Sequence, residues 1–275
     1  MDLLITNNTS SVKLSEKDIV TTHFEESTPS LVANTLSFKG RNGKLNFGGE
    51  YSEKKLSYTA YMYTNSQSDY EFKRNWLYQL LGNSNPYYIT PMYSNEPMYS
   101  YESPGETSGN KLGQKNNIES NKRFFVTLED TFAPELAGSV DSKQIYKINI
   151  TFVTAVLPFG ESKAKKLTIV SGIPYAGTVA ASQLEVPFVV KVLAKQNASG
   201  IDLTIGSRTW KYSGTVTSGD TFVIGGMYNT MNMLSINDDT NAEYFVLEPT
   251  GTGHIDVTCS IASEIGIEDY KELYL

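Results

Sequence analysis

The chain has 275 residues, of which 40% are apolar and 19% charged, enough hydrocarbon for a buried core and too little charge for a disordered chain. Its formal net charge of −7 argues against sequence-specific nucleic-acid binding, which needs cationic contacts to phosphate. The single cysteine excludes an intrachain disulfide, and no apolar run approaches the roughly 18 residues that span a bilayer. Since the N-terminus also lacks a signal-peptide pattern, we expect synthesis in the cytoplasm and no membrane insertion.

Composition and charge distribution favour two mainly β domains. The chain has 18 tyrosines and 12 phenylalanines against two tryptophans, together with many short runs of Val, Ile and Thr that prefer strands. Residues 166–275 carry 12 acidic and 6 basic side chains, whereas residues 1–165 are nearly balanced. The acidity therefore concentrates in the C-terminal part.

The first predicted elements are a hairpin and a strand. The runs 36–39 and 44–47 flank Gly40-Arg41-Asn42-Gly43, and Asn-Gly favours the positive φ angles of a tight hairpin turn. From Leu56 to Tyr63, apolar residues recur at every second position, which predicts a strand with one face on a core.

One helix is predicted next. Ser68 is placed to cap it, and Glu71 completes a capping box. Phe72, Trp76, Leu77 and Leu80 recur at helical spacing and predict the buried side, with Gly82 as the end of the helix. We interpret Trp76 as a core residue.

Residues 83–120 show no sustained period and contain several prolines and glycines. Loops longer than about 12–15 residues are usually functional or disordered. We predict a long loop or belt within residues 83–122 that clasps a neighbouring subunit, with a simple surface loop as the alternative. The candidate interface residues are its tyrosines, because tyrosine offers large contact area: Tyr87, Tyr88, Tyr93, Tyr99 and Tyr101.

Strands resume at residues 123–128 and 144–156, and a stretch rich in Ser, Lys, Gly and Ala then follows. We assign residues 1–165 to an N-terminal domain, 166–183 to a linker with one short strand, and 184–275 to a C-terminal domain. Regularly spaced short strands in the last region predict a β-sandwich: 186–194, 201–205, 221–224, 232–236, 244–247 and 255–261. We expect the tail from Ile265 to pack back on the first domain.

The order of these features resembles the distal tail proteins (Dit) of siphophages that infect Gram-positive bacteria. The N-terminal match consists of short motifs in sequence order: Gly40-Arg41-Asn42-Gly43, Gly48-Gly49-Glu50-Tyr51, Asn85-Pro86-Tyr87, Thr151-Phe152 and the run 157–162. The C-terminal match, to the family's galectin-like β-sandwich, consists of the runs 203–205, 220–224 and 244–249. The galectin sugar-site pattern is missing, since His254 stands between Gly253 and Ile255, and we expect no lectin activity.

The resemblance implies a fold with a barrel-like or sandwich N-terminal ring domain and one helix, followed by the galectin-like domain. It also implies a structural role at the virion tail tip or baseplate, in a homohexameric ring through which DNA passes without specific binding. The implied partners are the major tail or tube protein, the tail-associated baseplate hub protein, and receptor-binding or accessory baseplate proteins. A cyclic ring needs two different complementary patches on each subunit.

The residues themselves indicate no enzyme, cofactor or metal. His23 and His254 lack partners at zinc-site or triad spacing. The run 237–241 resembles a calcium loop, but Ala242 replaces its glycine, which favours a hairpin turn. The main alternative function is a carbohydrate-binding baseplate or receptor-binding protein, with Trp210 as the candidate glycan-stacking residue and core packing as its simpler interpretation. A hydrolase is a second alternative, without residues to activate water.

Overall fold

Alternating apolar side chains build the two central strands of the N-terminal part, β6 (Lys55–Thr64) and β11 (Lys143–Thr154). They pair antiparallel with each other along almost their whole length. Every second side chain of each strand is buried, as the alternation predicts for β6: Leu56, Tyr58, Ala60 and Met62 in β6, and Tyr146, Ile148, Ile150 and Phe152 in β11. This computed structural model describes residues 1–8, 10–94 and 117–275.

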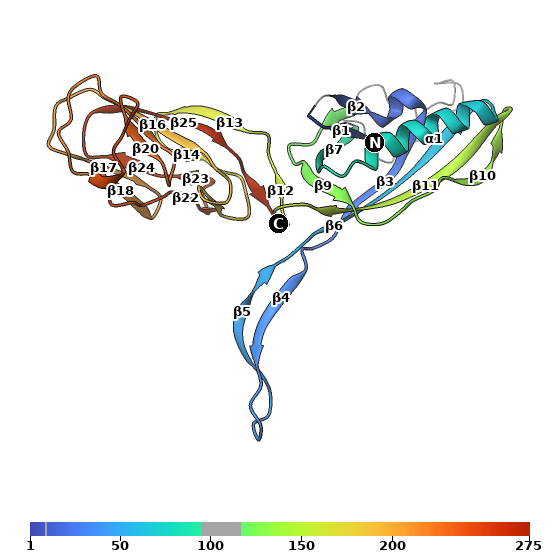
Figure 1. The fold of residues 1–275 in the computed structure, drawn as a ribbon, viewed down its shortest axis with the longest axis horizontal. Helices are drawn as coiled ribbons and strands as arrows, with labels where there is room; N and C mark the ends of the chain where they lie inside the picture. The colour runs from blue at the N-terminus through green and yellow to red at the C-terminus, as the bar shows by residue number, and fades with distance from the viewer. Residues whose placement is uncertain (9, 95–116) are drawn as a thin grey trace. The chain divides into compact units, whose positions relative to one another are not determined.

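The chain divides into two units, residues 1–160 with Leu275, and residues 161–274. Among the described residues of the first unit, nine strands form one sheet whose main order is β2-β1-β7-β9-β11-β6-β3, with β8 paired to β7 and β10 to β11 (Figure 1). The other strands of this sheet are β1 (Asp2–Thr6), β2 (Ser11–Lys13), β3 (Ile19–Glu26), β7 (Tyr87–Ser94), β8 (Asn117–Glu119), β9 (Phe124–Leu128) and β10 (Glu135–Val140).

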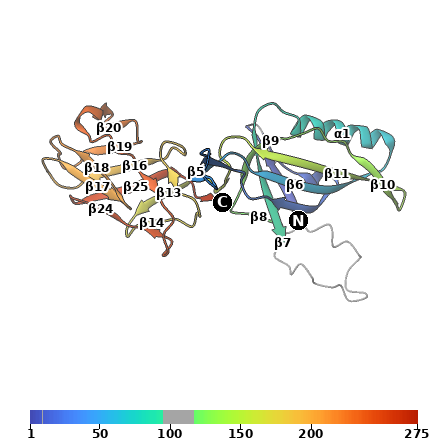
Figure 2. The ribbon, with the colours of Figure 1, turned by 90° about the horizontal axis from the view of Figure 1, so that it is seen from below.

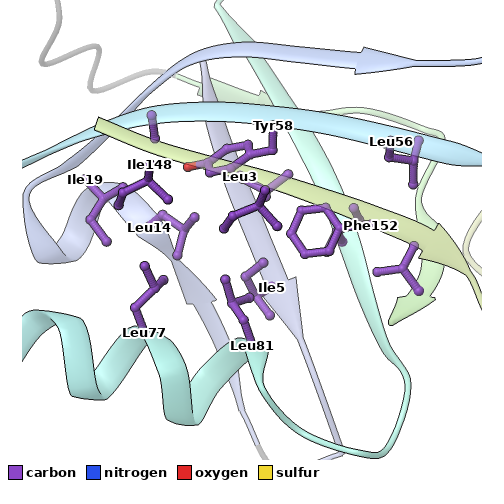
Figure 3. Close-up of a cluster of buried hydrophobic side chains, with 14 of the residues drawn as sticks. Leu3, Ile5, Leu14, Ile19, Leu56, Tyr58, Leu77, Leu81, Ile148 and Phe152 are labelled. Carbon is purple, nitrogen blue, oxygen red and sulfur yellow. The ribbon is translucent and has the colours of Figure 1, made fainter. Parts of the chain in front are cut away.

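The α-helix in the described part of the chain, α1 (Gln67–Leu81), covers one face of this sheet. Leu77 and Leu81 point from the helix toward Leu14, Ile19 and Ile5 (Figure 3). A short 3-10 helix, η1 (Leu14–Lys17), contributes Leu14 to the same cluster. The core of the first unit therefore lies between the helix and the sheet.

The helix differs from its prediction at the start. Ser66, not Ser68, is the N-cap, and its hydroxyl oxygen accepts a 3.1 Å hydrogen bond from the Asp69 backbone N–H. The buried face is Lys73, Leu77 and Leu81, so Phe72 is exposed, whereas Trp76 packs partly against the core. The helix ends at Gly82, as predicted.

Lys73 explains why the buried face of the helix differs from the predicted one. Its ammonium donates hydrogen bonds of 2.7 Å to Asp18 and 2.8 Å to the Tyr63 carbonyl, and lies 3.2 Å from Asp69. Because these oxygens satisfy the charge, the aliphatic stem can lie on the core. Apolar periodicity alone does not anticipate a lysine on the buried face.

The prediction of irregular structure throughout residues 83–120 is wrong for part of that segment. Residues 87–94 form β7, which pairs with β1 on one side and β9 on the other, and residues 117–119 pair with β7 as β8 (Figure 2). Neighbouring strands supply the hydrogen bonds that stabilise this run, despite Pro91 and its weak local pattern. Residues 95–116 lie outside the described residues.

The second unit is built from short antiparallel strands. Within its described residues, one sheet has the order β13-β25-β16-β19-β20-β21, and β18-β17-β24, β14-β23 and β15-β22 form smaller sheets. The strands are β13 (Lys165–Ile169), β14 (Ile173–Pro174), β15 (Ala181–Ser182), β16 (Val189–Ala194), β17 (Ile201–Ile205), β18 (Arg208–Tyr212), β19 (Thr221–Ile224), β20 (Asn229–Met231), β21 (Leu234–Ser235), β22 (Val246–Leu247), β23 (His254–Ile255), β24 (Val257–Cys259), β25 (Ser263–Tyr270) and β26 (Leu273–Tyr274). A further short strand is β12 (Gly160–Glu161), and a 3-10 turn is η2 (Asn237–Asp239).

Three sequence expectations change in this unit. Residues 166–183, expected as a linker, carry β13, β14 and β15 and belong to the unit itself. The tail does not simply return to the first domain, because β25 lies between β13 and β16 in the larger sheet. The expected strand 232–236 is instead a turn and the short β21. Predicted strands 201–205 and 221–224 are confirmed.

Candidate assembly surfaces

One exposed apolar element of the first unit is a two-stranded hairpin, β4 (Leu31–Leu36) and β5 (Leu45–Tyr51). It extends away from the nine-stranded sheet (Figure 1). Leu31 is 59% and Phe47 67% exposed, and other large apolar side chains on it are exposed as well: Val32, Leu36, Phe38 and Tyr51. A lone two-stranded hairpin is marginally stable in water, and an exposed apolar surface of this kind indicates a binding partner.

The chain reverses in the predicted region, but not through a tight Asn-Gly turn, because β4 ends at Leu36, β5 begins at Leu45, and the Arg41 N–H donates to the Phe38 carbonyl at 3.3 Å. This longer connection is cationic. Gly40 and Gly43 both have φ of +85°, a left-handed conformation in which glycine has no steric penalty. Lys39, Arg41 and Lys44 surround them. These three residues take part in none of the ion pairs formed by the described residues. We call residues 31–51 the hairpin and these three side chains its cationic turn.

The base of the hairpin is anchored by a buried ion-pair network. Lys54 is only 2% exposed, and its ammonium lies 2.7 Å from a Glu26 oxygen and 5.6 Å from the Phe124 ring centroid. The other Glu26 oxygen accepts a hydrogen bond from Lys122. Burial alone would raise the pKa of Glu26, but the hydrogen bonds from Lys122 and Lys54 outweigh it and hold that pKa below its ordinary value.

Backbone pairing continues from the sheet into the hairpin. The Ser27 N–H donates to the Lys55 carbonyl at 2.9 Å, and the Ser52 N–H donates to the Ser30 carbonyl at 2.9 Å. The Lys54 N–H also donates to the Thr154 hydroxyl oxygen at 3.0 Å. The hairpin is therefore a direct extension of β3 and β6 with a fixed base.

The predicted interface tyrosines do not form one exposed cluster. Tyr87 is buried, and its hydroxyl donates to the Leu81 carbonyl at the end of α1. Tyr88 is half-buried between Phe125 and Arg123, with 3.8 Å from the guanidinium carbon to its ring centroid. Tyr93 is exposed. Tyr99 and Tyr101 lie outside the described residues, and the belt within residues 83–122 stays a prediction.

Trp210 is a core residue. Its side chain is 0% exposed, stacked parallel to Tyr212 and edge-on to Phe222 with ring centroids 6.5 and 6.2 Å apart. A sugar ring therefore has no access to its face in this fold. Alternation within β18 explains the burial, because Trp210 and Tyr212 share the inward side of that strand.

The described residues contain no candidate metal centre. No group of three His, Cys, Asp or Glu side chains among them could hold a metal ion. His23 is exposed and pairs with Glu25 at 3.1 Å, and His254 is exposed. The turn at residues 237–239 binds its own backbone and neighbours, with the Asn237 side-chain oxygen accepting from Asn229. No helix in the described ranges is long and apolar enough to cross a membrane.

Sequence reasoning missed the exposure of the hairpin. It recognised the turn but assigned the clasping role to the later segment. The available signal was the adjacent pair Leu31-Val32 together with Phe38 and Phe47, which puts apolar side chains on both faces of a two-stranded element. A strand that packs on one core alternates apolar with polar residues instead.

Comparisons with known proteins agree with this architecture. The model of the phage tail protein RIFT-related domain matches residues 8–154, more than half of the chain. The Dit protein (gp 19.1) of phage SPP1, described as a paradigm of the hub adsorption apparatus in phages infecting Gram-positive bacteria, matches with a TM-score of 0.64 and 11% identity over 98% of each chain.

Two structures of the phage p2 baseplate in its activated conformation, with Sr and with Ca, match with TM-scores of 0.39 at 6% and 8% identity. They cover 98% of this chain and 98% and 97% of theirs, but scores at this level carry no argument about the fold. No curated protein sequence matches the chain. The resemblance seen in the short motifs is confirmed by the first two matches: the chain belongs to the phage tail protein family with the RIFT-related domain, and its fold is that of a Dit protein.

Proposed function

We propose that this phage tail protein is a ring-forming connector of the tail tip or baseplate, in which six copies join the tail tube to the baseplate hub protein. The exposed hairpin is the observation that carries the proposal. Its apolar side chains are exposed and would gain burial in contact with another chain, and such burial is the main driving force of association. The Dit-like fold supports placement at the hub.

The hairpin suits a cyclic assembly. Closed rings use head-to-tail contacts, in which a projecting element of one subunit meets a different surface of the next. A projecting hairpin with a fixed base satisfies that requirement, because the Glu26 network and the Ser30–Ser52 pairing hold its direction. We therefore propose the hairpin, rather than the 83–122 segment alone, as the main clasp between neighbours.

The proposed ring acts by assembly and not by chemistry. Receptor-binding or accessory baseplate proteins would attach to it, and DNA would pass through its channel without specific contacts. For that passage we expect polar or acidic side chains toward the channel, because fixed positive charge would retard a moving polyanion. The alternative of a carbohydrate-binding protein was based on Trp210 as a glycan-stacking residue, and Trp210 is buried.

The test is a hairpin deletion. Residues 31–51 are replaced by Asn-Gly, which joins Ser30 to Ser52 through a two-residue turn at a position where their backbones are already paired. Because the removed side chains are largely exposed, the nine-stranded sheet should remain folded. Light scattering of the unaltered protein should give six times the 30.5 kDa chain mass, and the deletion should give monomers.

A matched control keeps the hairpin and changes only the exposed residue Glu50 to Gln, which should leave the ring intact. Circular dichroism and the thermal transition check that the deletion variant is folded. A folded deletion variant that still forms the same ring would show that the hairpin is not the clasp. Unaltered protein that stays monomeric across concentrations, also with tail partners present, would refute the ring itself.

A further inference from the structure

The second unit has its own exposed apolar surface, along the β20–β21 edge of its larger sheet. Met227 is 81% and Met233 93% exposed, and Tyr228, Leu234 and Leu184 are exposed as well. We call these five residues the Met227 surface. Figure 2 shows β20 at the margin of this unit, next to β19. Flexible methionines on an exposed surface are typical of protein-binding sites.

The Met227 surface is hollowed by a pocket of about 360 Å³. Leu184, Met227 and Tyr244 form apolar parts of its wall, and Asn229 a polar part. The Asn229 amide nitrogen donates to the Gly226 carbonyl and the Asn237 side-chain oxygen, but its buried oxygen accepts no hydrogen bond. The volume lies at the small end of the range for ligand pockets and suits one or two side chains of a docked segment.

The turn between β20 and β21 carries unrelieved strain at Met233. Asn232 and Met233 have φ of +50° and +70°, a conformation that costs energy for a residue with a β-carbon. At Asn232, hydrogen bonds with Asp220 and Thr221 offset this conformational cost. The Met233 side chain projects into solvent, so packing within its own unit does not offset the cost of its positive φ. Strain of this kind concentrates at functional sites.

Three acidic residues are sequence neighbours of residues that form the Met227 surface or its pocket. Glu185 follows Leu184, and Asp238 and Asp239 follow the pocket residue Asn237. All three carboxylates are exposed, and none takes part in the ion pairs formed by the described residues. Arg208, whose guanidinium lies over the ring of the pocket residue Tyr244, is already paired with Glu243 at 2.7 Å. A partner for this surface should therefore be apolar with cationic ends.

The hairpin has that chemistry: exposed Leu36, Phe38 and Phe47 beside a cationic turn without carboxylate partners. We infer that the hairpin of a second copy docks on the Met227 surface, with its phenylalanines toward the pocket and its cationic turn toward Glu185, Asp238 and Asp239. This inference rests on the proposed ring and names the acceptor surface that the hairpin needs.

Two exposed apolar residues of the first unit, Phe72 and Leu136, fit the hairpin less well. Phe72 stands beside Glu71 and near Arg74, and Leu136 beside Glu135 on a strand paired to the lysine-bearing β11. Charges of both signs surround them, so these residues offer no net attraction to a turn with three positive charges. Complementary charge sets the orientation of docking and suppresses wrong partners.

Site-directed crosslinking of full-length chains tests the inference. Cys259, the only cysteine, is first changed to Ser. A tagged chain with Phe38→Cys is then co-expressed with an untagged chain with Met227→Cys, and the assembled protein is oxidised. We expect a disulfide-linked pair, at a yield at least tenfold above that of a control chain with Thr168→Cys, an exposed position on β13.

Failure of the inference is distinguishable from failure of the ring. Intact rings in which Phe38→Cys links to Met227→Cys no better than to Thr168→Cys would overturn the docking inference and leave the proposed function standing. Chains that neither link nor exceed monomer mass would overturn both.

A charge exchange gives a second readout. Asp238→Lys with Asp239→Lys should raise the concentration for half-assembly about tenfold, since each exposed charge pair contributes modestly. Lys39→Glu with Lys44→Glu should do the same, and the two double variants combined should recover most of the loss. A combination that assembles no better than its weaker parent would contradict the proposed contact.

Discussion

Replacement of Glu26 with Gln is the most informative change in the first unit, because this carboxylate anchors the hairpin. Its oxygens contact Lys54 and Lys122. Within the described ion pairs, Glu26 is the only carboxylate that meets Lys54, whose side chain is nearly inaccessible to water. The amide would remove the negative charge and leave the Lys54 ammonium buried without a counter-ion.

The expected loss follows from burial. Removing one partner of a buried ion pair typically costs about 3–5 kcal/mol. Glu26 is a third exposed and Lys122 a quarter, so water screens part of the effect, and we expect a loss of about 2 kcal/mol in the free energy of unfolding of the first unit. For a unit of this size, that corresponds to roughly 4–8 °C in its melting temperature.

Calorimetry of the full chain measures the transition of each unit, and Glu25→Gln is the matched control. Glu25 is adjacent in sequence but well exposed, with only His23 at 3.1 Å, so its change should alter stability by less than about 0.5 kcal/mol. Adding Lys54→Met to Glu26→Gln should recover part of the loss, because the orphaned buried charge is then absent. Equal effects of Glu25→Gln and Glu26→Gln would refute this reasoning.

The loss of unfolding free energy caused by Glu26→Gln should become smaller at acidic pH. The pKa of Glu26 lies below its ordinary value of 4.5 in the folded chain, so the folded state favours the charged form. Its contribution is fully present above pH 4.5 and is lost as the pH falls through the lower folded pKa. The difference in stability between the unaltered chain and the Glu26→Gln variant should therefore be constant near neutrality and shrink in acid. A difference that grows in acid would contradict the assigned network.

Three further changes test other parts of the structure. Trp210→Ala should destabilise the second unit by about 3–5 kcal/mol through a core cavity, seen as a lower melting temperature of that unit alone; a near-neutral effect would contradict its burial. Tyr87→Phe should cost about 1 kcal/mol by removing the hydrogen bond to the Leu81 carbonyl but leave the oligomeric mass unchanged; loss of assembly would instead assign Tyr87 to an interface. Met233→Gly should stabilise the second unit by about 1 kcal/mol by relieving its positive φ, measured by denaturant unfolding, while weakening association; weaker folding would show that the turn is unstrained.

Local patterns in the sequence were enough for the elements that pack on one core. The alternation in β6 and β11 predicts their strands through periodicity, and the glycines of the hairpin connection and at the end of α1 predict a chain reversal and a helix end through backbone preference. The N-terminal motifs were also enough for the family, since the RIFT-related domain match over residues 8–154 includes all of them except the run 157–162.

Other features depended on partners distant in the sequence. Lys73 lies on the buried face of α1 because Asp18 and the Tyr63 carbonyl receive its charge, and β7 forms because β1 and β9 flank it. Likewise, β13 and β25, read from sequence as linker and tail, become strands by pairing with each other.

The sequence by itself indicated a mainly β chain, the helix that the described residues contain as α1, and a resemblance to phage tail proteins. Only the tertiary structure decided which apolar side chains remain in water: Trp210 is buried, whereas Phe72 and the hairpin are exposed. The physical reason is that periodicity reports the apolar side of an element, but the neighbours available to cover that side are set by the packing of the whole unit.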